Sequence, residues 1–266
     1  MTHITSRENS LLRKARAVRD GEIHDLIFAE GLRLCEEALN SGLDIEALIY
    51  SEEISEKERA KRFLTEATSA VKKLAIVSER LLASISYTKT PQGIVALARR
   101  PETGKVRIEA GSVQIPLLVV IHQLNNPVNV GAILRSAEAA GATGVITTET
   151  TADPFSPKAL RGAMGSAFRL PMWTGVTYFQ MLQWCGENGL KTVCADVEAT
   201  TTHTDFDWKR PTALIVGPES DGLSAEEIAA AGGSVRIPMQ GDVESLNVGV
   251  ATGILLFEAA RQRAQR

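Results

Sequence analysis

The stretch Ile115-Pro-Leu-Leu-Val-Val-Ile-His-Gln-Leu124 decides the fold class of this chain. Its apolar run is nearly continuous, which is typical of a strand buried on both faces of a parallel sheet. A polar loop follows at residues 125–130, and a helical pattern at 131–140 stops at Gly141. A buried strand that leads through a loop into a helix is the repeating unit of a parallel α/β sheet. The sequence therefore predicts an α/β fold.

The same alternation of strands and helices runs through the whole chain. Upstream, the pattern predicts strands at 25–29, 45–50, 71–77 and 93–98, and helices at 31–41, at 55–70 and after Ser78. Downstream, it predicts strands at 145–148, 191–197, 212–216 and 235–239, and helices at 178–186, from Ser224 and at 246–263. A hydrophilic stretch at 99–111 lies between the two sets. We therefore expect two α/β domains, residues 1–105 and 106–266.

The composition is that of an ordinary globular protein, with 44% hydrophobic and 23% charged residues among 266. No apolar run reaches the roughly 18 residues of a membrane span, and the polar N-terminus lacks a signal-peptide stretch. We expect a cytoplasmic protein with no membrane partner. Cys35, Cys185 and Cys194 form no CxxC pair and are expected to be buried. The four histidines lack metal-ligand spacing, so no metal is expected.

The net charge of −3 argues against a protein that coats nucleic acid through bulk charge. A local basic run nevertheless opens the chain, where residues 1–20 contain five bases and two acids. Its bases are Arg7, Arg13, Lys14, Arg16 and Arg19. From charge alone, this run is either a solvated helix face or a set of phosphate contacts.

Three polar segments follow predicted strands, where open α/β sheets place their ligand crevice. The first, at 125–135, has Asn129 at an expected helix N-cap and Arg135 about two turns into the helix. In the second, at 217–224, Gly217 and Gly222 bracket an acid. In the third, at 237–251, Ser245 and Asn247 stand at the mouth of a mostly apolar helix. The sequence contains neither G-x-G-x-x-G nor G-x-x-x-x-G-K-[ST]. Their absence argues against a nucleotide-dependent oxidoreductase.

Together these segments resemble the SpoU branch of the SPOUT methyltransferases, which methylate RNA ribose 2′-hydroxyls with S-adenosylmethionine. They read N-x-G-x-x-x-R-S-A, G-x-E-x-x-G-L-S and I-P-M-x-G-x-x-x-S-L-N-V, in the order and spacing of that family. The resemblance covers about residues 117–263. Upstream, residues 28–39 look like the substrate-binding domain of many of these enzymes, which is similar to ribosomal protein L30e.

The resemblance implies a C-terminal domain with a deep trefoil knot and a homodimer with its active site at the interface. By motif position, the implied catalytic residues are Asn129, Arg135, Glu219, Ser245 and Asn247. The implied cofactor-binding residues are Gly217, Ile237, Met239 and Leu246. The candidate RNA-binding residues are Arg7, Arg13, Lys14, Arg16 and Arg161. Two positions depart from the common pattern: Pro218 stands where Asn is frequent, and Gly249 where Ser is frequent.

Methyl transfer from a sulfonium is an in-line displacement that needs alignment and removal of a proton, but no metal. Family proposals give Arg135 the activating role. Because a guanidinium is always protonated in proteins, we interpret Arg135 as a phosphate clamp, with Glu219 or water taking the proton. The expected activity is 2′-O-methylation of 23S ribosomal RNA. The alternatives are a catalytically silent RNA-binding or ribosome-assembly protein of this fold, and a transfer RNA 2′-O-methyltransferase. The target nucleotide and the choice between a housekeeping and an antibiotic-resistance role stay open.

Overall fold

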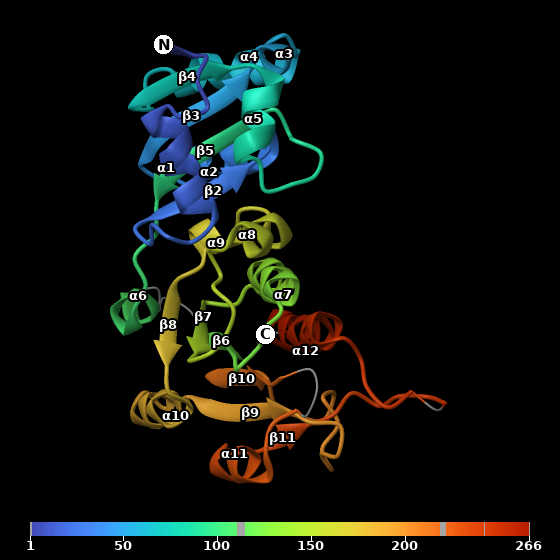
Figure 1. Ribbon diagram of the computed structural model, residues 1–266. Coiled ribbons are helices and arrows are strands. Elements are labelled where there is room, and N and C mark those ends of the chain that lie inside the picture. Colours follow the sequence, from blue (N-terminus) through green and yellow to red (C-terminus); the bar gives the residue numbers. More distant parts are fainter. Residues whose placement is uncertain (1, 111–114, 219–221, 242, 266) are drawn as a thin grey trace. The chain divides into compact units, whose positions relative to one another are not determined.

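The computed structural model describes residues 2–110, 115–218, 222–241 and 243–265. Its contacts divide the chain into two compact units. The first unit extends to Pro101 and also includes Pro154–Arg169, while the second comprises Glu102–Asp153 and the chain from Leu170 onward. Both units combine helices and strands, so the predicted α/β class is confirmed (Figure 1). The sequence predicts two continuous domains with a boundary after residue 105. In the structure, the first unit also includes the separate segment 154–169.

The first unit is built on a five-stranded sheet of order β1-β4-β3-β5-β2. Its strands are β1 Thr2–Ile4, β2 Leu26–Glu30, β3 Ile45–Ser51, β4 Lys73–Val77 and β5 Ile94–Arg99. The pairs β1·β4 and β4·β3 are parallel, and β5 pairs antiparallel with both β3 and β2. Its helices are α1 Ser10–Arg19, α2 Leu32–Asn40, α3 Glu52–Ser55, α4 Glu58–Ala67, α5 Glu79–Ile85, α8 Pro157–Ala163 and α9 Ser166–Arg169.

Most of the N-terminal basic run lies in helix α1, and one side of this helix is buried. Asn9 caps the helix by accepting a hydrogen bond from the Leu11 amide at 2.9 Å. Leu12, Ala15 and Val18 are buried in the core of the first unit. The apolar side of α1 therefore contributes to that core, while its basic residues lie on the remaining surface.

A buried carboxylate organises the turn that precedes β5. Glu30, at the end of β2, is 6% exposed and accepts hydrogen bonds from the Tyr87 amide at 2.9 Å and the Thr88 amide at 3.2 Å. It also accepts hydrogen bonds from the hydroxyls of Ser86 and Thr88. No local sequence pattern indicates this role, because Glu30 and its partners lie more than 50 residues apart.

We expect Glu30→Ala to lower the free energy of unfolding of the first unit by about 2 kcal/mol, because it leaves several partly buried donors without an acceptor. Urea unfolding measures the change. Glu46→Ala is the matched control, since it removes a partly exposed carboxylate that pairs with Lys14 and should cost about 1 kcal/mol or less. Equal costs for the two variants would contradict the assigned role of Glu30.

The second unit contains a six-stranded parallel sheet of order β11-β9-β10-β6-β7-β8. Its strands are β6 Leu117–Ile121, β7 Gly144–Thr148, β8 Met172–Val176, β9 Lys191–Ala195, β10 Thr212–Val216 and β11 Ser234–Val235. Its helices are α6 Lys105–Ala110, α7 Pro127–Ala139, α10 Tyr178–Glu187, α11 Ala225–Ala230 and α12 Val248–Ala264. The apolar stretch quoted first forms β6, which is buried along its whole length.

Three elements of the second unit differ from the sequence expectation. Strand β8 was not predicted. Its residues are buried, half-buried or exposed without regular alternation, so the strand has no simple apolar pattern. The stretch at 99–111, expected to be a linker, contains α6, whose Ile108 is buried. The strand expected at 235–239 is only the two-residue β11.

The order of the strands creates a switch point between β6 and β10. From β6 the chain proceeds outward through β7 to β8, whereas β9 and β11 lie on the other side of β10. In parallel sheets, ligands bind beyond the carboxyl ends of the strands where the strand order reverses. The polar segments at 125–135 and 217–224 follow β6 and β10 directly.

The end of α12 is hydrogen-bonded to the segments that precede β6 and β10. The Arg263 guanidinium donates hydrogen bonds to four carbonyl oxygens, those of Ile115, Pro116, Trp208 and Arg210, at 2.7 to 3.0 Å. These contacts hold the C-terminal helix against the strand beginnings. The trefoil knot stays a prediction from the family resemblance.

The three cysteines are buried and free, as predicted. Burial raises the pKa of the Cys185 thiol to about 12 and that of Cys194 to about 11. None of the helices within the described residues is long and apolar enough to cross a bilayer.

Candidate active site

Helix α7 begins earlier than its apolar pattern suggests. Asn126 is the N-cap and accepts a hydrogen bond from the Val128 amide at 3.0 Å, while Pro127 occupies the first turn. Proline is favoured at that position because its missing N–H would be unpaired there anyway. The expectation that Asn129 caps the helix is therefore wrong: it lies inside α7 and is 7% exposed.

Two candidate catalytic residues, 118 positions apart in sequence, meet where α7 and α12 begin. Asn247 is the N-cap of α12, and its side-chain oxygen accepts hydrogen bonds from the amides of Gly249 at 3.0 Å and Val250 at 3.3 Å. Its side-chain nitrogen donates to Oδ1 of Asn129 at 3.3 Å. The cap thus fixes the orientation of Asn247 and joins it to the buried Asn129.

Small residues allow α7 and α12 to pack side by side (Figure 1). A Cβ atom at Gly249 would lie 3.5 Å from Ala132, and one at Gly253 would lie 3.8 Å from Ser136. At Gly249, a Cβ would also stand 3.2 Å from the cap oxygen of Asn247. The glycine that replaces the commoner serine therefore leaves room around the cap.

The other candidate catalytic residues have different surroundings. Arg135 lies on α7 with an exposed side chain, and no hydrogen bond or ion pair joins it to any described residue. Ser245 is also exposed, two residues before the α12 cap. Glu219 lies outside the described residues. The free guanidinium of Arg135 suits an anionic group of a substrate, because it has five unused donors.

The candidate cofactor residues follow β10 and β11. Gly217 comes directly after β10, and a Cβ there would stand 2.8 Å from Cγ of Leu223, so glycine is needed for this close approach. Ile237, Met239 and Leu246 are half-buried apolar side chains. A glycine directly after one strand and apolar side chains after the next are residue types that suit the adenosine part of S-adenosylmethionine, because cofactor sites are mostly apolar with a few polar contacts. Within the described part of the chain, no group of three or more His, Cys, Asp and Glu could hold a metal ion.

The sequence pattern does not reveal the buried polar group at this edge of the sheet, which is centred on His122. His122 follows β6 and is 2% exposed. Its Nδ1 lies 2.9 Å from the Thr148 hydroxyl, and its Nε2 lies 2.9 Å from the Glu227 carboxylate. Burial would raise the pKa of Glu227, but the Ser224 amide and hydroxyl together with His122 lower it below the usual value. Neither contact could be found from the sequence, because both depend on strand order.

The candidate RNA-binding residues divide into free and engaged groups. Arg7, Arg13 and Arg161 have exposed side chains. Lys14 forms an ion pair with Glu46, and a guanidinium nitrogen of Arg16 donates to the Arg7 carbonyl at 3.0 Å. The structure therefore assigns Lys14 and Arg16 contacts inside the first unit, which the charge pattern could not reveal.

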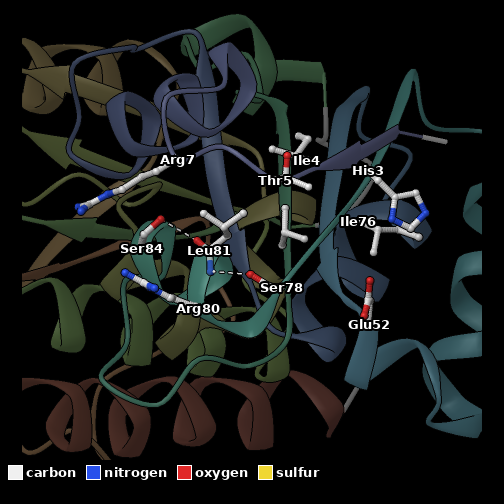
Figure 2. A pocket seen from close by; sticks show the side chains of 11 residues that line it. His3, Ile4, Thr5, Arg7, Glu52, Ile76, Ser78, Arg80, Leu81 and Ser84 are labelled. Atoms are coloured by element: carbon white, nitrogen blue, oxygen red, sulfur yellow. Dashed lines mark hydrogen bonds between the residues drawn. The ribbon is translucent and has the colours of Figure 1, made fainter.

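A hollow of about 520 Å³ adds an arginine that the sequence analysis did not single out. It lies beyond the carboxyl ends of β1 and β4, and Arg7 and Arg80 both line it (Figure 2). No ion pair joins either of these arginines to a described residue. His3, Thr5, Ser78 and Ser84 add polar groups, and Glu52 adds one acid.

Both parts of the chain match families of RNA-modifying proteins. Residues 116–257 match the SpoU rRNA Methylase family, and residues 11–96 match the MRM3-like substrate binding domain. An uncharacterized tRNA/rRNA methyltransferase of Synechocystis is 32% identical over 98% of this chain and 94% of its own length. A 23S rRNA (guanosine-2′-O-)-methyltransferase of a Burkholderia species is 35% identical over 78% of this chain and 85% of its own length.

A solved structure is similar along almost the whole length. The rRNA methyltransferase of Sinorhizobium meliloti, determined with S-adenosylmethionine bound, superimposes with a TM-score of 0.83 at 30% identity. The similarity covers 97% of both chains.

Proposed function

The chain belongs to the SpoU rRNA methylase family, and on that premise we propose that it transfers the methyl group of S-adenosylmethionine to a ribose 2′-hydroxyl of 23S ribosomal RNA in the cytoplasm. The observation that carries the proposal is the junction of Asn129 with Asn247, together with the exposed Arg135 on the same helix as Asn129. It joins the first and third motifs at one edge of the sheet. The Burkholderia relative acts on 23S ribosomal RNA, and the Sinorhizobium relative binds the cofactor.

Each group of candidate residues has a separate role in the proposed reaction. Gly217, Ile237, Met239 and Leu246 hold the cofactor, which supplies an electrophilic methyl carbon. Arg135 binds the phosphate beside the target ribose through its planar fork and stabilises negative charge that develops on the 2′-oxygen. Asn129, Ser245 and Asn247 supply neutral polar groups that orient the reactants. Glu219 or a water molecule takes the proton, because Arg135 is already protonated.

A second copy of the chain completes the proposed enzyme. Val250, Ile254 and Phe257 on α12 are exposed apolar side chains, at 53%, 38% and 54%. They line a hollow of about 520 Å³ that also contains Asn247 and Ala132. Because exposed apolar patches with a polar edge mark interaction surfaces, we propose that this face forms a two-fold homodimer next to the active site.

The test of the proposed function has two parts. Calorimetry of the purified protein with S-adenosylmethionine separates an enzyme from a catalytically silent RNA-binding protein, which would take up no cofactor. Mapping ribose methylation on ribosomal and transfer RNA, with and without the gene, then identifies the substrate. We expect one site in 23S ribosomal RNA to lose its methyl group. Loss of a transfer RNA methyl group alone would favour the alternative substrate.

We propose that the first unit binds RNA phosphates through Arg7 and Arg80, together with Arg13 and Arg161. The double variant Arg7→Gln/Arg80→Gln is expected to weaken RNA binding and to reduce the slope of log affinity against log salt by roughly 0.7 to 0.9 per lost contact. Affinity for S-adenosylmethionine should stay unchanged, because the cofactor residues lie in the second unit. Titrations of RNA and of cofactor at several salt concentrations measure these effects.

The control is Arg59→Gln/Arg62→Gln, which removes the same charge from α4, outside the hollow. If both double variants change the salt slope equally, bulk charge and not the hollow accounts for RNA binding. Substitutions are preferable to deletion of residues 1–20, since that deletion would remove Leu12, Ala15 and Val18 from the core.

A further inference from the structure

His122 lies at the centre of a closed set of contacts around the ends of the segment at 217–224. Its backbone N–H donates to the Val216 carbonyl at 2.9 Å, directly before Gly217. Its Nε2 meets Oε1 of Glu227 at 2.9 Å. Oε2 of Glu227 accepts hydrogen bonds from both the amide and the hydroxyl of Ser224, each at 2.8 Å. The set closes where Leu223 packs against Gly217.

The other ring nitrogen connects this set to the first motif. Nδ1 of His122 lies 2.9 Å from the Thr148 hydroxyl at the end of β7. The same hydroxyl oxygen accepts a hydrogen bond from the Gln123 amide at 3.1 Å. Gln123 has a φ of 49°, a left-handed conformation that is unfavourable for a residue other than glycine. Thr148 therefore holds the strained residue from which the chain leaves β6 toward α7.

We propose that His122 is a positioning residue that holds the two ends of the 217–224 segment together, so that Gly217 is preorganised for the cofactor. This inference rests on the proposed function of Gly217 in binding S-adenosylmethionine. The side chain of His122 links the end of β6 to Glu227 and through it to Ser224, and its backbone holds the end of β10. Without it, the N-terminal cap of α11 loses its side-chain hydrogen bond to the residue that follows β6.

The surroundings of His122 exclude a direct role as the base of the reaction. The side chain is 2% exposed, and both ring nitrogens have partners at 2.9 Å. Tyr178 further encloses it: the two rings lie 4.8 Å apart, and the Tyr178 hydroxyl donates to the Glu227 carbonyl at 2.9 Å. A substrate hydroxyl has no access to such an imidazole, so His122 acts through Glu227 and Ser224.

Two isosteric substitutions separate the functions of the two ring nitrogens. The amide nitrogen of glutamine can replace Nε2 of histidine, and the shorter asparagine can replace Nδ1. His122→Gln keeps a donor for Glu227 and is expected to bind S-adenosylmethionine within about threefold of the wild type. His122→Asn loses that donor and is expected to raise the dissociation constant about tenfold, which corresponds to about 1.4 kcal/mol. Equal affinities for the two variants would overturn the proposal.

A double-mutant cycle with Glu227→Ala tests whether His122 acts through that carboxylate. The cofactor affinity of His122→Asn/Glu227→Ala should equal that of Glu227→Ala alone; additive losses would overturn the proposal. Thr192→Val is the matched control, because it removes a partly buried hydrogen bond of 2.9 Å from the Gly232 amide, just beyond the other end of α11. It should lower thermal stability to a similar degree but leave cofactor affinity unchanged.

Hydrogen exchange without cofactor distinguishes failure of this inference from failure of the proposed function. The amides of Ser224 and Glu227 should exchange at least tenfold faster in His122→Asn than in the wild type or in Thr192→Val. If the wild type does not bind S-adenosylmethionine but this acceleration occurs, the proposed function fails and the link to Glu227 stands. If the wild type binds the cofactor and the exchange rates do not change, the positioning role of His122 is wrong.

Discussion

Arg135→Lys is expected to lower the rate of methyl transfer about 10²- to 10³-fold while changing the affinity for S-adenosylmethionine by no more than a few-fold. Lysine keeps the positive charge but loses the planar fork that binds a phosphate through two parallel hydrogen bonds. The exposed side chain of Arg135 makes no hydrogen bond or ion pair with the described residues, so the substitution should not destabilise the fold. Single-turnover assays with saturating cofactor measure the rate, and calorimetry measures the affinity.

Arg210→Lys is a suitable control for this substitution. Arg210 is also exposed, and its guanidinium pairs with Asp207 near the surface, in the loop that precedes β10. Its rate should stay within about twofold of the wild type. If Arg135→Lys turns over as fast as this control, Arg135 is not the phosphate clamp.

Phe257→Glu is expected to convert the proposed homodimer into a monomer at micromolar concentration and to reduce methyl transfer by about 10²-fold or more. A two-fold axis brings the same substitution into the interface twice, and each carboxylate would lose its hydration there. Sedimentation velocity measures the mass, and the methylation assay measures the loss. A wild type that is already monomeric at micromolar concentration would contradict the proposed interface.

Phe179→Glu is the matched control for the interface variant. Phe179 lies on α10 and is 65% exposed, compared with 54% for Phe257 on α12. Both variants exchange an exposed phenylalanine for glutamate, but only the one on α12 lines the hollow that contains Asn247. The control should therefore stay dimeric and active, while a monomeric control would indicate a general effect of the added charge.

Local patterns in the sequence were sufficient for the fold class and for the places of most motifs. The apolar run at 115–124 predicted a buried parallel strand because each residue of such a strand faces a covering layer. The helix expected from Ser224 is present, and its capping box of Ser224 and Glu227 is a local pattern because it depends on residues three apart. The start of α7 could also have been predicted from the sequence. Asn126 followed by Pro127 is a helix-start signal, but the apolar pattern pointed to a later start.

The contacts that assemble the candidate site depend on the tertiary structure. Asn129 meets Asn247 across 118 residues, and His122 meets Glu227 across 105. Both pairs exist because β6 and β10 are neighbours in the sheet and because α12 packs on α7. Charge patterns were equally insufficient at the N-terminus, where Lys14 is paired with Glu46 and Arg7 lines the same hollow as the distant Arg80.

The α/β class, the family motifs and the types of polar residue could thus be recognised from the linear pattern alone. Hydrophobic period, caps and motifs are properties of neighbouring residues, so a linear pattern records them. Which polar residues are held by partners, and which are exposed to bind a substrate, follows from the three-dimensional fold. The physical reason is that a side chain's partners depend on strand order and helix packing, which bring together residues that no local pattern connects.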